Sequence, residues 1–112
     1  MQQVRVAREF GIERILLANE LWGAPALNYL ADELERDERF DFYVSSTRWP
    51  ESTPWQACRR RRVRRPLQVL VEVGVAGKRC GCRGVAASLE VARAVQRASP
   101  WLQLRGVEGF EG

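Results

Sequence analysis

The N-terminal part of the chain carries a pattern of apolar and charged residues that predicts a helix followed by a strand. Apolar positions recur at helical spacing over residues 2–10, and Gly11 suits a helix C-terminus. Residues 15–18 then form a short continuous apolar run. Such a run is typical of a strand that is buried on both faces.

The next elements follow the same order, a helix and then strands. Ala24 and Pro25 open the helix, with the proline near its first turn. Residues 32–39 supply its polar side, and the apolar stripe opposite consists of Leu27, Leu30, Ala31 and Leu34. Residues 40–44 are a predicted second strand, and residues 67–73, rich in valine and leucine, are a third.

One more helix and strand complete the pattern. Ser88 is the predicted N-cap of a helix that runs through Ala98, and Ser99-Pro100 ends it. Its buried face would use Val91, Ala94, Val95 and Ala98. Residues 102–107 are the last predicted strand. Strands that alternate with helices indicate parallel βα units, so we expect an α/β fold with about four parallel strands.

Length and composition narrow the class of protein. The 112 residues are enough for one small domain, and a hydrophobic share of 46% excludes wholesale disorder. No apolar run is long enough to span a bilayer, and no secretory pattern follows Met1, so we expect a soluble, cytoplasmic protein without a membrane partner. Histidine is absent, which excludes Ser-His and Cys-His catalysis and His-based metal sites.

The positive charge of the chain is concentrated in one short segment. The formal net charge is +4. Residues 1–57 carry six arginines against ten acidic residues, whereas the eight residues 58–65 alone contribute +6. The basic residues are therefore concentrated in this short segment, and the rest of the chain is mildly acidic.

Several candidate sites can be weighed from their residues alone. The loop around Lys78 would need glycine at Glu72 and serine or threonine at Arg79 to be a phosphate-binding loop, so it does not match. The three cysteines (Cys58, Cys80 and Cys82) are too few for zinc without histidine, which favours ordinary reduced thiols. Glu72 and Glu111 could act as acid or base, but a structural or solvated role is favoured for both.

Four segments together resemble a known family. They read VRVAREFGIERILLANEL, LADELERD, RPLQVLVEVGVAGKRCGCRG and LQLRGVEGFEG. They are similar to the alanine-racemase N-terminal-domain superfamily, and most of all to its D-threonine aldolase and D-serine dehydratase (D-amino-acid deaminase-like) branch. The similarity covers about residues 2–44 and 66–112.

The resemblance implies a pyridoxal 5′-phosphate-binding (β/α)8 barrel that acts on small-molecule D-amino acids and whose members can be dimers. Residues 1–112 are then an interior, partial barrel from about the second helix to the sixth strand. The Schiff-base lysine of the family would lie upstream of Met1, and Lys78 is not its counterpart. The metal-binding His and Cys of the family's C-terminal domain are missing as well. We therefore expect this chain to be inactive alone.

The resemblance also suggests residues that contact the cofactor. Arg79 matches the arginine that approaches the phenolic oxygen of the cofactor, and Gly81 follows it, with Cys80 where the family usually has threonine. Glu111 belongs to a segment that leads into pocket residues, and Asn19 would lie on the rim where barrel sites assemble. The alternatives are a solvated loop arginine at position 79 and a turn residue at position 19.

Residues 45–65 do not fit the family. They contain no leucine or isoleucine and have no helical period. A shift of one nucleotide restores a Val-Asp-Ser segment, so we hypothesise two compensating frameshifts, near residues 45 and 65, in a segment that is out of frame or disordered. The alternative is a small basic module whose arginine run at residues 59–65, with Trp49 and Trp55, binds RNA or another polyanion. We favour the frameshift over an evolved nucleic-acid partner.

Overall fold

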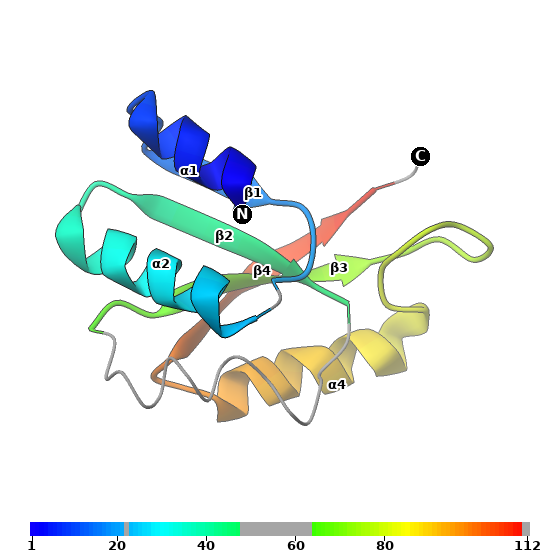
Figure 1. The fold of residues 1–112 in the computed structure, drawn as a ribbon. Coiled ribbons are helices and arrows are strands. Elements are labelled where there is room, and N and C mark those ends of the chain that lie inside the picture. Colours follow the sequence, from blue (N-terminus) through cyan, green and yellow to red (C-terminus); the bar gives the residue numbers. More distant parts are fainter. Residues whose placement is uncertain (22, 48–63, 111–112) are drawn as a thin grey trace.

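The computed structural model describes residues 1–21, 23–47 and 64–110 (Figure 1). Its elements are α1 (Gln2–Glu9), β1 (Arg14–Leu17), α2 (Ala24–Arg36), β2 (Asp41–Ser46), β3 (Leu67–Val73), α4 (Gly84–Arg97) and β4 (Leu102–Gly109). The strands form one sheet in the order β1-β2-β3-β4, and every neighbouring pair is parallel. The predicted α/β fold with parallel strands is confirmed.

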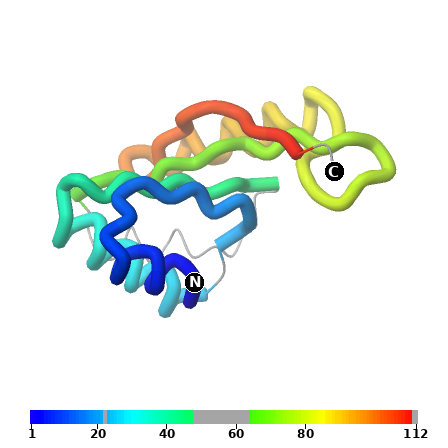
Figure 2. Tube along the Cα trace, turned by 90° about the horizontal axis from the view of Figure 1, so that it is seen from above, coloured from blue at the N-terminus to red at the C-terminus, as the bar shows by residue number. Residues whose placement is uncertain are grey.

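The helices that the structure describes all lie on one side of this sheet. Buried residues of α1, α2 and α4 belong to one apolar cluster together with residues of β2, β3 and β4. Figure 2 shows α1 and α2 next to each other on one side of the strands, and Figure 1 shows α4 below the strands. One row of side chains crosses the four strands on this face: Leu17, Val44, Val69 and Leu104. Val44 and Val69 in the middle of the row are fully buried. No described helix covers the opposite face of the sheet.

The predicted apolar stripes of the helices form the core. In α2, Leu27, Leu30, Ala31 and Leu34 are all buried, as expected. In α4, Val91, Ala94 and Val95 are buried, whereas Ala98, just beyond the helix, is only partly buried. Burying one leucine or valine side chain contributes about 1.5–3 kcal/mol, so this shared core is the main source of stability.

Two local predictions were wrong. The apolar run at residues 15–18 is not buried on both faces, because Leu16 faces the side of the sheet that no described helix covers, and 49% of it is exposed. Ser88 does not cap α4, which begins four residues earlier at Gly84. Its hydroxyl instead donates a hydrogen bond to the Gly84 carbonyl inside the first turn, at 3.0 Å.

The predicted polar side of α2 contains one buried exception, Glu33, which is only 4% exposed. Arg8 of α1 explains it: its Nε lies 3.0 Å from Glu33 Oε2, and its Nη2 lies 2.8 Å from Asp37 Oδ2. Burial alone would lower the Arg8 pKa, but the hydrogen bonds to Asp37 and Glu33 outweigh it and raise that pKa. The guanidinium also lies over the Phe40 ring, 4.1 Å from its centre. This cluster attaches α1 to α2.

Both ends of the unusual segment 45–65 are ordered parts of the fold. Ser45 and Ser46 are buried residues of β2, so the strand continues two residues beyond the predicted end at 44. Arg65 donates hydrogen bonds to the carbonyl oxygens of Leu34, Asp37 and Phe40 at 2.9–3.0 Å. Carbonyl groups at a helix C-terminus lack partners within the helix, and a cation there also complements the helix dipole.

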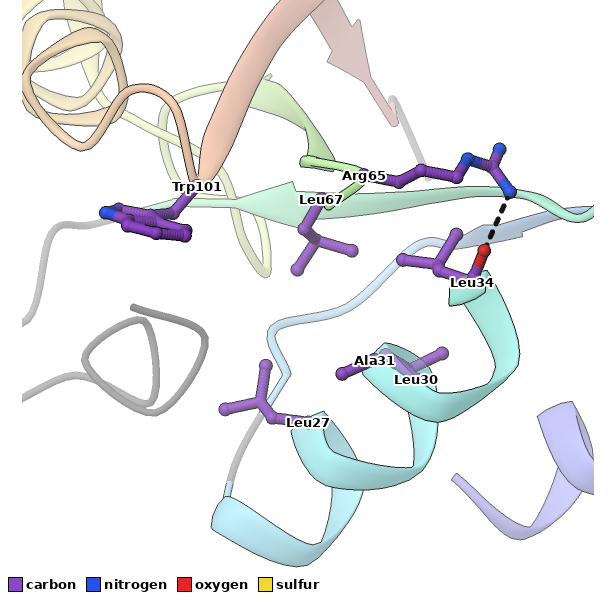
Figure 3. Close-up of a pocket in the computed structure, with 7 residues that line it drawn as sticks. All are labelled: Leu27, Leu30, Ala31, Leu34, Arg65, Leu67 and Trp101. Atoms are coloured by element: carbon purple, nitrogen blue, oxygen red, sulfur yellow. Dashed lines mark hydrogen bonds between the residues drawn. The ribbon is translucent and has the colours of Figure 1, made fainter. Parts of the chain in front are cut away.

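Arg65 also borders a small apolar recess between α2 and the start of β3 (Figure 3). The recess is lined by Leu27, Leu30, Ala31, Leu34, Arg65, Leu67 and Trp101. Its lining is almost entirely apolar and belongs to the core, so we assign it a packing role. Among the described residues, no helix is long and apolar enough to cross a membrane.

Replacing Arg65 by alanine is expected to lower the free energy of unfolding by about 1–3 kcal/mol, because three carbonyl groups lose a charged donor. The matched control is Arg64→Ala, which removes the neighbouring, exposed arginine and should change stability by no more than about 0.5 kcal/mol. Urea unfolding followed by circular dichroism measures both. Equal effects of the two substitutions would show that Arg65 does not cap α2.

Candidate functional site

The carboxyl ends of parallel strands are where βα folds assemble their sites, because the loops that follow the strands converge there. Here that edge contains Glu20 after β1, Thr47 after β2, Glu72 near the end of β3 and Glu108 in β4. The loop of residues 74–83 follows β3 and leads into α4. We refer to this edge, together with the loop, as the rim.

Hydrogen bonds cross the rim from strand to strand. The Thr47 hydroxyl donates to Glu20 Oε1 at 2.5 Å, which links the ends of β1 and β2. The Ser45 hydroxyl donates to the Glu108 carboxylate, which links β2 to β4 across β3. The Cys82 thiol donates to the Thr47 carbonyl at 3.0 Å. The rim is therefore a connected set of groups from all four strands and the loop.

The rim loop folds back onto the end of β3. The Cys82 amide donates to the Glu72 carbonyl at 2.7 Å, and the Gly74 amide donates to the Cys82 carbonyl at 3.0 Å. The Arg83 guanidinium donates to the carbonyls of Cys80, at 2.6 Å, and of Gly81, at 3.1 Å. Backbone bonds and one arginine thus fix the shape of the loop.

The start and end of the loop touch through two glycines. Gly81 has φ +90, and a Cβ placed on it would lie 2.3 Å from the Gly74 nitrogen. A Cβ on Gly74 would in turn lie 2.0 Å from the Cys80 carbonyl oxygen. No side chain can be accommodated at either position unless the backbone moves, because the atoms it would meet are mostly backbone.

Both described cysteines of the rim are free thiols. The Glu72 carboxylate, which is buried, raises the pKa of the Cys80 thiol by hydrogen bonding, and Arg79 opposes this only in part. Burial raises the pKa of the Cys82 thiol. Raised pKa values keep both sulfurs protonated near neutral pH, which makes them poor nucleophiles and poor metal ligands. Within the described ranges, no group of three or more His, Cys, Asp or Glu side chains is placed to hold a metal ion.

The residues suggested as cofactor contacts have different positions. Arg79 is exposed on the rim loop, in the same loop as Gly81. Asn19 follows β1 and is exposed, and its Oδ1 accepts a hydrogen bond from the Glu20 amide at 2.8 Å. This is a local hydrogen bond between neighbouring residues of the loop. Glu111 lies outside the described residues, and a cofactor contact of the other three stays a prediction.

Sequence reasoning missed a polar cluster on the face of the sheet that no described helix covers, which we call the open face. The cluster surrounds Asp41, near the amino ends of the strands. Asp41 accepts hydrogen bonds from Arg14 Nε at 3.2 Å, from the Tyr43 hydroxyl at 3.1 Å and from the Gln68 amide. Burial would raise the Asp41 pKa, but these donors outweigh it and lower that pKa. The period of two in Asp41, Tyr43 and Ser45 is the signal that could have shown a polar strand face.

The sequence and the structure were compared with known proteins, and only the structural comparison gives a match. No family model matches the sequence, and no curated protein matches it. The structure is similar to the crystal structure of D-threonine aldolase from Filomicrobium marinum, with a TM-score of 0.73 and 23% identity. The chain has a partial barrel-like fold. The match covers 98% of this chain, which spans 28% of that aldolase, and it confirms the predicted fold class.

Gly81→Ala is expected to disrupt the rim loop, whereas Gly77→Ala is the matched control. Both glycines have a positive φ, but a Cβ on Gly77 would meet nothing within 4 Å. Gly77→Ala should therefore cost only the conformational strain of about 1–2 kcal/mol. Gly81→Ala should cost clearly more and should speed hydrogen exchange of the Cys82 amide. Similar costs for the two substitutions would contradict the close contact with Gly74.

The Asp41 cluster predicts acid sensitivity of the fold. Because the folded-state pKa of Asp41 is lowered, its stabilising contribution is complete above the unfolded-state pKa of about 3.9 and is lost as the pH falls through the folded-state value. Asp41→Asn removes this titration. The difference in unfolding free energy between the original protein and Asp41→Asn should therefore shrink from about pH 6 to about pH 3.

Urea unfolding at a series of pH values measures this difference. Glu35→Gln, on the exposed side of α2, is the control and should leave the pH profile almost parallel to that of the original protein. A difference for Asp41→Asn that stays constant with pH would show that its donors do not hold Asp41 in the charged form.

Proposed function

We propose that this chain forms part of the pyridoxal 5′-phosphate-binding barrel of an enzyme that acts on D-amino acids, a lyase of the D-threonine aldolase or D-serine dehydratase type. The observation that carries the proposal is the connected rim at the carboxyl ends of the strands, on a fold similar to a D-threonine aldolase. The open face of the sheet then corresponds to part of the inner wall of the barrel.

The described residues could bind the side of the cofactor that carries the phenolic oxygen, but they offer no lysine on a strand for its covalent attachment. Arg79 offers a guanidinium on an exposed part of the rim, where it could donate to the phenolic oxygen of the cofactor and disperse its charge. The single lysine of the chain, Lys78, lies exposed in the loop and not on a strand. Pyridoxal 5′-phosphate supplies the electron sink for such reactions, but no step through it is assigned to this chain.

The other rim groups would shape the environment of that cofactor edge. The Gly74–Gly81 contact fixes the loop that carries Arg79. Glu72 keeps the Cys80 thiol protonated, so the thiol does not compete as a nucleophile for an aldehyde carbon nearby. Glu20 and Glu108 are held by hydroxyl donors from Thr47 and Ser45, which orients their carboxylates within the rim.

The alternative function, polyanion binding by the arginine run, gains no support from the described residues. Residues 59–63 lie outside the described ranges. Arg65, the last residue of the run, binds three backbone carbonyls and caps α2. The frameshift hypothesis for residues 45–65 stays a prediction that genomic sequencing of the locus tests.

Arg79→Ala is expected to weaken binding of the cofactor ring by about threefold to tenfold, since one charge-assisted hydrogen bond in a partly exposed site is lost. The probe is pyridoxine 5′-phosphate, which keeps the ring and the phosphate but cannot form an imine with Lys78. Equilibrium dialysis measures the dissociation constant. Arg93→Ala, which removes an exposed arginine on α4, is the control. Unchanged binding by Arg79→Ala would contradict the assignment of Arg79.

The same preparation tests the expected lack of activity. With pyridoxal 5′-phosphate added, the isolated chain should not cleave D-threonine or deaminate D-serine, because Lys78 is not placed on a strand end. Turnover that disappears in Lys78→Arg would overturn this expectation and would make Lys78 the attachment site.

A further inference from the structure

Among the described residues, Glu72 is the only carboxylate of the rim that is buried. Val69 and Val71 of β3 belong to the apolar core beneath the helices, and side chains alternate along a strand, so Glu72 lies on the open face. It is nevertheless only 5% exposed. An ionised carboxyl group is costly to bury unless hydrogen-bond donors or positive charges compensate it. The groups next to Glu72 therefore have to account for its burial.

The rim loop supplies these groups, because it folds back along the end of β3. The Cys82 amide donates to the Glu72 carbonyl at 2.7 Å, and Cys82 also forms a parallel bridge with Val73. The Arg83 guanidinium holds the Cys80 carbonyl at 2.6 Å. The half-buried Cys80 thiol donates a hydrogen bond to the Glu72 carboxylate. The loop thus provides the buried carboxylate with a donor.

The same thiol also contacts Arg79. The Arg79 guanidinium donates a hydrogen bond to the Cys80 sulfur, and its positive charge partly opposes the effect of Glu72 on the thiol. A thiol has one hydrogen, and here it points to Glu72, so the lone pairs of the sulfur are left for an N–H group of Arg79. A guanidinium has five N–H donors, so others stay available for a ligand. Glu72, Cys80 and Arg79 form a chain in that order.

We propose that Glu72 is a positioning residue: through the Cys80 thiol it holds the Arg79 guanidinium where it binds the phenolic oxygen of the cofactor. Glu72 itself does not touch the cofactor. An exposed arginine loses much side-chain freedom when it binds a ligand, and an arginine that is already held loses less. This inference rests on the proposed function, because it concerns the cofactor contact of Arg79.

Alkylation of Cys80 by iodoacetamide tests the chain of contacts without any cofactor. Only the thiolate reacts, and mass spectrometry of peptides separates Cys80 from the other cysteines. Glu72→Gln removes the charge but keeps the shape, so Cys80 should react about threefold faster or more near pH 7.5, with its pH profile moved to lower pH. Arg79→Ala should have the opposite effect. Glu90→Gln removes an exposed carboxylate of α4 and should change neither.

The pH profile separates this role from a purely structural one. If Glu72→Gln merely loosened the loop, Cys80 would react faster at every pH without a shift of the profile, and Arg79→Ala would not slow the reaction. Either result would overturn the proposal, as would an unchanged rate in Glu72→Gln. Circular dichroism confirms that each variant is folded.

Binding of pyridoxine 5′-phosphate, measured by equilibrium dialysis, tests the effect on the cofactor contact. Glu72→Gln and Cys80→Ala should each weaken binding by about twofold to tenfold, because Arg79 is then no longer held beforehand. Cys80→Ser keeps one hydrogen for Glu72 and lone pairs for Arg79, so it should retain the affinity within about twofold. In the Arg79→Ala background, Glu72→Gln should cause no further loss, since both substitutions remove the same interaction.

The outcomes distinguish this inference from the proposed function. A further loss from Glu72→Gln in the Arg79→Ala background would show that Glu72 acts by another route and would overturn the inference. Full affinity of Cys80→Ala would do the same. Weaker binding by Arg79→Ala together with unchanged binding by Glu72→Gln overturns the inference and leaves the proposed function standing. Unchanged binding by Arg79→Ala overturns the assignment of Arg79 and this inference with it.

Discussion

The row of side chains Leu17, Val44, Val69 and Leu104 is the constraint on which the rest of the structure depends. A parallel sheet normally has both faces covered, because its βα connections bring helices to it. Here all the described helices pack on the face that carries this apolar row. The other face is consequently available for polar side chains, and the Ser45–Glu108 pair and the Asp41 cluster both lie on it.

Much of the fold could be predicted because its signals are local. The stripe Leu27, Leu30, Ala31, Leu34 identifies the buried side of α2, and residues 67–73 match β3 from end to end. The start of α4 could not be predicted in the same way. Ser88 has the side chain of a common N-cap residue, but α4 begins four residues earlier, at Gly84, where the rim loop ends. No local sequence pattern indicates this earlier start.

The site was less accessible to sequence reasoning, because its contacts join distant residues. Arg79 and Gly81 could be suggested only through a family resemblance. The pairs Ser45–Glu108 and Thr47–Glu20 depend on strand order and register, which place residues far apart in sequence on one edge. The roles of Arg8 and Arg65 were hidden for a similar reason: a charged residue that satisfies buried groups on another element is indistinguishable in sequence from a solvated one.

The Gly74–Gly81 contact has a consequence for how this sequence can change over time. A Cβ on either glycine would clash with backbone atoms at or next to the other glycine. Replacing a side chain elsewhere in the loop therefore cannot make room for a side chain at position 74 or 81. The two positions are therefore expected to stay glycine together in related chains, or to be lost together with the loop shape. Cys80 beside them has no such constraint from the backbone, so substitutions should accumulate there first.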